Sequence, residues 1–225
     1  MELQDVVPWG RSLAEYRSMF SLTDADLGKR ILGCGDGPAS FNAEVTAAGG
    51  HVISVDPVYA FSGFQIRSRI AEVYPTILEQ LARHRGDYIW DHFPGVEQVA
   101  NARMQAMERF LQDYELGRQQ GRYVEAALPA LPFENHAFEL ALCSHFLFLY
   151  STQLNLEAHV AGTRELCRVA REVRIYPLVS LEGMESPHLG AVVERLHAEG
   201  IAARREAVNY RFQKGATDML VLYKA

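Results

Sequence analysis

The sequence is poor in cysteine and in long apolar runs, and each shortage excludes a class of protein. Its three cysteines, Cys34, Cys143 and Cys167, are an odd number without paired spacing, which excludes a disulfide framework. No apolar run approaches about 18 residues, so no membrane span is expected. The first twelve residues carry two acids and a proline before any apolar stretch. We therefore expect no secretory signal and a cytoplasmic protein.

Lysine is also scarce, and neither sign of charge forms a long run. The net charge is −6, and lysine occurs only at Lys29, Lys214 and Lys224. A mildly acidic chain is not expected to hold long nucleic acid, which requires neutralisation of many phosphates. The 225 residues, 48% of them hydrophobic, suit a single α/β domain over residues 1–225 with a real core. No feature of the sequence indicates an oligomeric state.

The most informative segment is a glycine-rich loop between an apolar strand and a helix. Residues 31–41 read ILGCGDGPASF, with glycine at every second position from Gly33 to Gly37. Residues 51–57 read HVISVDP, a second strand that ends at the carboxylate of Asp56. Glycine lets backbone approach a ligand closely, and a carboxylate at this position can accept both hydroxyls of a ribose. The pattern predicts a site for a nucleoside-containing cofactor.

The glycine spacing narrows the choice of cofactor. A dinucleotide site has the pattern G-x-G-x-x-G, whereas the glycines here follow G-x-G-x-G, one residue tighter. This loop, with an acid ending the next strand, resembles the class I S-adenosylmethionine-dependent methyltransferases. Residues 131–150, 164–178 and 211–225 resemble the same family's fourth strand, fifth strand with its preceding helix, and closing hairpin. Residues 60–122 have no counterpart.

The resemblance implies a fold, a cofactor and an activity. The fold would be α/β, a Rossmann-like, mostly parallel seven-stranded sheet of order 3-2-1-4-5-7-6. The cofactor would be S-adenosylmethionine, and the activity would be methyl transfer to a small-molecule acceptor. The implied cofactor-binding residues are Gly33, Cys34, Gly35, Asp36, Gly37, Asp56, Pro57, Ala127, Leu128, Ser144 and His145.

Two positions depart from the family pattern. Ile31 and Ala127 stand where many members carry acids that contact the methionine and adenine amino groups. Asp36 and the N-terminal segment are the candidates to replace them. Arg11 and Tyr16 in that segment either close over the cofactor or pack on the sheet edge.

His145 is the first candidate for a general base, needed only if the acceptor must lose a proton of high pKa. Tyr150 and His92 are weaker candidates. A histidine beside an apolar strand is also often a packed, hydrogen-bonded side chain, so both roles stay open. Cys143 and His145 have no second pair at ligand spacing, and no metal site is expected.

Periodicity predicts the other elements, and their alternation implies parallel strands with right-handed crossovers. The expected helices occupy about 10–20, 38–50, 154–170 and 188–199. The expected strands are Arg30–Gly33, His51–Val55, Tyr123–Ala127, Phe138–Ser144, Val173–Val179, about 203–212 and about 217–224.

Residues 60–122 are predicted to be a helical insert between the second and third strands. Apolar residues recur at helical spacing in two stretches, with Pro75 as a kink or break in the first and Gly117 as the end of the second. The aromatic residues of loop 86–95 between them either line a pocket or pack only to hold the loop in place. We expect the insert to form a lid and substrate wall over the carboxyl edge of the sheet.

Two other functions fit part of the pattern. A protein that binds S-adenosylmethionine or S-adenosylhomocysteine without turnover, as a sensor or interaction module, is compatible with the two missing acids. A nicotinamide-dependent oxidoreductase is the other, which the glycine spacing opposes. Binding of the cofactors distinguishes the oxidoreductase, and turnover distinguishes the sensor.

Overall fold

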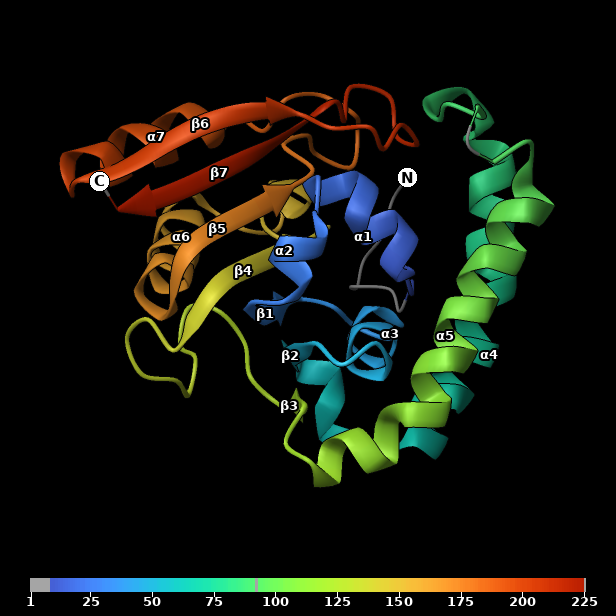
Figure 1. Cartoon of the computed structure of the whole chain (residues 1–225). Helices are drawn as coiled ribbons and strands as arrows, with labels where there is room; N and C mark the ends of the chain where they lie inside the picture. Colours follow the sequence, from blue (N-terminus) through green and yellow to red (C-terminus); the bar gives the residue numbers. More distant parts are fainter. Residues whose placement is uncertain (1–8, 92, 225) are drawn as a thin grey trace.

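One sheet of seven strands organises the computed structural model, which describes residues 9–91 and 93–224 (Figure 1). The strands are Arg30–Cys34 (β1), His51–Val55 (β2), Tyr123–Val124 (β3), Phe138–Ser144 (β4), Ala170–Tyr176 (β5), Ile201–Ala207 (β6) and Asp218–Lys224 (β7). Their order is β3-β2-β1-β4-β5-β7-β6. β7 pairs antiparallel with β5 and β6, and the other neighbours are parallel. The predicted fold class and strand order are confirmed.

Helices cover both faces of the sheet. They are α1 (Leu13–Phe20), α2 (Asp24–Leu27), α3 (Phe41–Ala47), α4 (Gly63–Arg83), α5 (Val96–Gln119), α6 (Leu156–Val169) and α7 (Leu189–Ala198), with short 3₁₀ turns at Pro57–Ala60, Arg85–Asp87 and Phe148–Tyr150. α6 and α7 lie on one face, whereas α1, α3 and the α4–α5 pair lie on the other (Figure 1). Among the described helices, none is long and apolar enough to cross a bilayer.

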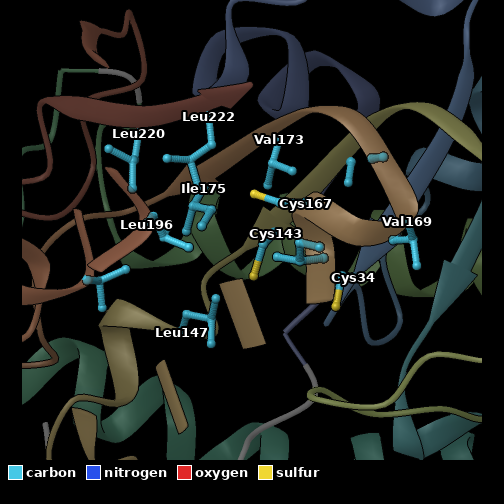
Figure 2. Packing of buried hydrophobic residues seen from close by; sticks show 14 of the residues in the cluster. Cys34, Cys143, Leu147, Cys167, Val169, Val173, Ile175, Leu196, Leu220 and Leu222 are labelled. Atoms are coloured by element: carbon cyan, nitrogen blue, oxygen red, sulfur yellow. The ribbon is translucent and has the colours of Figure 1, made fainter. Parts of the chain in front are cut away.

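Alternation of side chains along the strands divides the core into two halves. On β1, Leu32 belongs to the cluster under α6 and α7, and its neighbour Ile31 belongs to the cluster under α1 and α3. Figure 2 shows the first of these clusters, in which Cys34, Cys143 and Cys167 lie among aliphatic side chains. All three thiols are free and buried. The cysteines therefore act as small apolar core residues.

Several predicted boundaries were wrong around the glycine loop and the edge strand. β3 ends at Val124 and not at Ala127, because its partner β2 ends at Val55. α3 begins at Phe41 and not near Pro38, because residues 36–39 form a tight turn. In this turn the N–H of Ala39 donates to the carbonyl of Asp36 at 3.3 Å.

Other boundaries were wrong where packing overrides a local signal. Helix α4 continues through Pro75, which excludes the break, one of the two expected alternatives. Helix α5 continues past Gly117, where a Cβ would lie 2.3 Å from the ring of Tyr123, so this glycine permits close packing and does not end the helix. β5 spans Ala170–Tyr176 and stops before Pro177, which has no N–H to donate.

The remaining differences concern the closing hairpin and the first helix. β6 spans Ile201–Ala207, because β7 starts opposite Ala207 and leaves residues 208–217 as the connection. The first helix starts at Leu13, because Ser12 and Glu15 form a capping box there.

Buried Arg103 connects the α4–α5 insert to both ends of the chain. It lies on α5 and is fully buried. Its Nη1 donates to the carboxylate of Glu15 on α1 at 2.5 Å, and its Nη2 donates to the hydroxyl of Tyr210 at 3.0 Å. Tyr210 in turn donates to Glu15 at 2.8 Å. The guanidinium also lies 5.8 Å from the ring centre of Trp9 and 5.6 Å from that of Phe93. The insert is therefore fixed to α1 and to the chain after β6.

Replacing Arg103 should destabilise the protein more than replacing an exposed arginine on the same helix. Arg103→Met leaves the buried Glu15 carboxylate without its partner and should lower the free energy of unfolding by about 3 kcal/mol. Arg109→Met, at an exposed position on α5, should change it by less than about 0.5 kcal/mol. Urea unfolding followed by circular dichroism measures both. Similar small losses in the two variants would contradict this account of Arg103.

Candidate functional site

Two adjoining pockets open where β1 separates β2 from β4. The sheet's connections run in opposite directions from this point, which is where open α/β sheets bind ligands. The pockets share Gly35, Gly37, Pro38, Asp56 and His145. We call the one toward β3 the edge pocket, with a volume of about 360 Å³, and the one toward α1 the central pocket, with a volume of about 130 Å³.

The edge pocket is an apolar slot. Its walls come from the glycine loop, the end of β2, the start of the insert, the chain after β3 and Phe146. The apolar lining residues are Cys34, Val55, Pro57, Val58, Phe61, Ile66, Ala126, Ala127, Leu128 and Phe146. Gly35 has a φ of +71°, and a Cβ there would lie 3.1 Å from Cβ of Phe146. Besides Cys34, the charged or titratable residues of its described lining are Asp56, Arg69 and His145.

Asp56 lies at the junction of the two pockets. Its Oδ2 accepts the N–H of Gly37 at 2.9 Å, and its Oδ1 accepts the N–H of Val58 at 2.9 Å. Burial raises the pKa of Asp56, and the two N–H groups oppose that rise. Each carboxylate oxygen retains a lone pair for a further donor. Asp56 therefore orders the loop and can still accept a pair of ligand hydroxyls.

Asp36 folds back beneath the glycine loop. A Cβ on Gly33 would lie 1.8 Å from Asp36 Oδ2, so only glycine leaves room for this carboxylate. Its Oδ1 accepts the hydroxyl of Tyr16 at 2.7 Å, and its Oδ2 accepts the hydroxyl of Ser54 at 2.6 Å. Asn42 donates to Ser54 Oγ at 3.1 Å, which leaves the Ser54 hydrogen for Asp36. Burial raises the pKa of Asp36 to about 6.

Arg11 supplies a positive charge to the central pocket. Its Nη1 donates to the carbonyl of Trp9 at 3.3 Å. Its Nε is buried and has no hydrogen-bond partner among the described residues. Burial, followed by the nearby charge of Arg103, lowers the pKa of Arg11. Among the described residues, the central pocket is thus lined by two acids, Asp36 and Asp56, and by one cation, Arg11, whose Nε has no partner.

His145 lies between the pockets in a left-handed backbone conformation, with a φ of +52°. Its backbone N–H donates to the carbonyl of Tyr176 at 2.7 Å, and its ring Nδ1 lies 3.0 Å from Ser144 Oγ. Burial holds the pKa of His145 well below its usual value, and the charges of Arg11 and Arg103 lower it further. The imidazole is therefore neutral near pH 7. Within the described residues, no group of three or more His, Cys, Asp or Glu is arranged to hold a metal ion.

The rest of the central pocket is aromatic and aliphatic except for Gln213. This lining comes from α4, the insert tip, the 3₁₀ turn after β4 and the loops after β5 and β6: Ile77, Leu81, Tyr88, Leu149, Tyr150, Leu181, Phe212 and Gln213. Tyr88 stacks on Phe212 with ring centres 4.8 Å apart. The N–H of Ile89 donates to the carbonyl of Phe212 at 2.7 Å. The insert tip and the loop after β6 therefore form one continuous wall.

This chain is similar in sequence to one curated protein and in structure to several solved proteins. No protein-family model matches the chain. An uncharacterized protein of Methanocaldococcus jannaschii is 29% identical over 223 residues, which cover 99% of this chain and 98% of the relative. The mitomycin 7-O-methyltransferase MmcR aligns over 95% of this chain and 54% of its own, with 12% identity and a TM-score of 0.50. The pyocyanin biosynthetic protein PhzM aligns over 95% and 55%, with 14% identity and a TM-score of 0.50.

This chain spans about half the length of each of these two structures. Together with the strand order β3-β2-β1-β4-β5-β7-β6, the alignments decide the architecture. The chain has the class I S-adenosylmethionine-dependent methyltransferase fold. In this methyltransferase fold the two pockets occupy the carboxyl edge of the sheet on either side of the glycine loop.

The methyltransferase fold brings together nearly all the residues that the sequence singled out. The residues that line one or both pockets are Cys34, Gly35, Asp36, Gly37, Asp56, Pro57, Ala127, Leu128, Ser144 and His145. Gly33 instead leaves space for Asp36. Arg11 and Tyr16 line the central pocket, and Tyr150 lies in its wall, whereas His92 lies outside the described residues.

Other parts of the site were missed by the sequence analysis. Phe212 and Gln213 line the central pocket, and Ser54 supports Asp36. In the aromatic loop of the insert both alternatives hold, because Tyr88 lines the central pocket and Phe93 is buried in the core.

The buried Asp36 carboxyl should make stability depend on pH. Its pKa is about 6 when folded and 3.8 ordinarily, so folding favours the protonated form. The free energy of unfolding should therefore fall as the pH rises from about 4 to 6, by up to about 3 kcal/mol relative to Asp36→Asn, and the difference should be constant above pH 7. Urea titrations at several pH values measure this. Parallel pH profiles for the two proteins would refute the buried, protonatable carboxyl.

Proposed function

We propose that this protein is an S-adenosylmethionine-dependent methyltransferase that acts on a small-molecule acceptor. The observation that carries the proposal is the arrangement around the glycine loop. An apolar slot lies on one side, a buried acid and a cation lie on the other, and Asp56 stands between them. The apolar slot would suit adenine, Asp56 would suit the ribose, and the acid and cation would suit the zwitterionic methionyl group.

The edge pocket suits the adenosyl part. Asp56 has lone pairs left for both ribose hydroxyls after it accepts the N–H groups of Gly37 and Val58. Adenine would lie among the apolar residues next to Pro57, Ala127 and Leu128. Since Ala127 replaces the usual acid, apolar contacts and backbone groups would hold the base.

The central pocket suits the methionyl part. The ammonium group of that part requires an acid, and within the described residues Asp36 accepts only the hydroxyls of Tyr16 and Ser54. The methionyl carboxylate requires a donor, and the Nε–H of Arg11 has no acceptor among the described residues. Asp36 would therefore take the place of the acid that Ile31 lacks, because its carboxylate lies directly over Gly33.

The cofactor would supply a methyl group on a sulfonium, which is already a good leaving group. The protein's task would be to align the acceptor and to exclude water. The insert, residues 60–122, would act as the lid and acceptor wall, because Ile77, Leu81 and Tyr88 line the central pocket. The name of mitomycin 7-O-methyltransferase specifies a small-molecule acceptor, which agrees with a walled cavity of this size. We place the protein in the cytoplasm, in a single domain over residues 1–225.

Calorimetry with S-adenosylmethionine and S-adenosylhomocysteine tests the cofactor. Asp56→Ala should weaken binding at least ten-fold, because two charge-assisted hydrogen bonds to the ribose are lost. Asp56→Asn, which retains the shape and one acceptor oxygen, should have an intermediate effect. Glu108→Ala, which removes an exposed negative charge from α5, serves as the control and should bind normally.

The outcomes separate the rival functions. An unchanged dissociation constant in Asp56→Ala, or tight binding of a nicotinamide dinucleotide in place of S-adenosylmethionine, would rule out the proposed cofactor site. Tight binding of S-adenosylmethionine with no methyl transfer to any acceptor would favour the sensor.

A further inference from the structure

We propose that the protein has a second binding site, for a sugar phosphate, at the edge of the sheet opposite the glycine loop. The site is a cavity of about 490 Å³ that lies where β4 and β5 begin and β7 ends. It shares no lining residue with the edge pocket or the central pocket. A ligand here is therefore separate from the proposed cofactor and methyl acceptor.

The lining of this cavity carries an uncompensated positive charge. Arg164 donates from Nε and Nη2 to the two carboxylate oxygens of Glu199, at 2.8 and 2.5 Å. Arg168 donates from the same two nitrogens to the two carboxylate oxygens of Glu165, at 2.7 Å in each case. Lys224 also lines the cavity and has no ion-pair or hydrogen-bond partner among the described residues. The two arginine pairs cancel, so the charge of Lys224 is available to an anion.

Two further donor groups around the cavity are free. Within the described chain, Nη1 of Arg164 makes no hydrogen bond, since Glu199 takes only Nε and Nη2. Asn135 Oδ1 accepts from Arg168 Nη1 at 2.9 Å, so the amide NH₂ of Asn135 keeps both of its hydrogens. A phosphate monoester carries a charge of about −1.5 to −2 and three acceptor oxygens. Its oxygens match the ammonium, guanidinium and amide donors.

His136 adds a buried nitrogen that lacks a partner. Its backbone N–H donates to the carbonyl of Arg168 at 2.9 Å, and its φ is +54°, so the residue is held beside the cavity in a left-handed conformation. Its ring Nδ1 is buried and has no hydrogen-bond partner among the described residues. Buried polar atoms in native structures are almost always paired. A ligand oxygen beside this ring would supply the partner.

The size of the cavity and the rest of its lining indicate the organic part of the ligand. An orthophosphate ion would fill only a small part of about 490 Å³. The carboxylates of Glu165 and Glu199 keep lone pairs that can accept sugar hydroxyls. Among the described lining residues there is no Phe, Tyr or Trp on which a nucleobase could stack. A polyhydroxylated group therefore suits the cavity better than a nucleoside.

Ligand-observed NMR titrations of the full chain with glucose 6-phosphate, glucose and orthophosphate test the site. Glucose 6-phosphate should bind at least ten-fold more tightly than glucose or orthophosphate, because it alone engages the cation and the hydroxyl acceptors together. Lys224→Met should weaken its binding at least five-fold. Lys214→Met, at an exposed lysine on the loop after β6, is the matched control and should leave the affinity unchanged.

A second variant tests the histidine. His136→Asn removes the imidazole but keeps a residue type that tolerates the left-handed backbone conformation. It should weaken glucose 6-phosphate binding at least three-fold, with a circular dichroism spectrum like that of the unchanged protein.

Three results would overturn the assignment. Absence of glucose 6-phosphate binding would remove the site. Equal affinities for glucose 6-phosphate and orthophosphate would exclude a sugar in the cavity. Equal affinities of Lys224→Met and the unchanged protein for glucose 6-phosphate would show that the phosphate binds elsewhere. None of these depends on whether S-adenosylmethionine binds at the glycine loop.

Discussion

The burial of the Asp36 carboxylate beneath the glycine loop is the constraint on which the site depends. It requires the absence of a side chain at Gly33, a donor from α1 in Tyr16 and a donor from β2 in Ser54. The loop is thereby tied to two elements that are distant in sequence. Because the carboxylate is desolvated, it is held ready for a cation and costs stability while none is bound. A ligand ammonium group would relieve that cost.

The second constraint is the position of the insert. Arg103 bonds to Glu15 and Tyr210, and Ile89 bonds to Phe212, so α1, the insert and the loop after β6 meet over the central pocket. None of these segments could line a cavity alone. Their meeting supplies the aromatic wall on one side of His145, while the common sheet supplies the loop and Asp56 on the other. Binding of the cofactor would depend on the shared fold, and choice of the acceptor on the three segments.

The strand order was predicted through the resemblance to the methyltransferases, which the local signals of the glycine loop and Asp56 revealed. The predicted ends of helices and strands were wrong where contacts distant in the sequence determine them. Gly117 looked like a helix end but makes room for Tyr123, and β3 is short because β2 stops at Val55. In the site, the loop residues could be predicted from spacing. The role of Phe212 could not be predicted, because it depends on a contact with Tyr88, more than 100 residues earlier in the chain. The role of Ser54 could not be predicted either, because only the folded structure shows that it donates to Asp36.

The most direct test of the central claim is a crystal structure of the protein with S-adenosylhomocysteine. The account predicts ribose hydroxyls within hydrogen-bond distance of Asp56, adenine beside Leu128, and the homocysteine ammonium group on Asp36 with its carboxylate on Arg11. Density for the ligand elsewhere, or in this cavity with Asp36 still bonded only to Tyr16 and Ser54, would contradict the account.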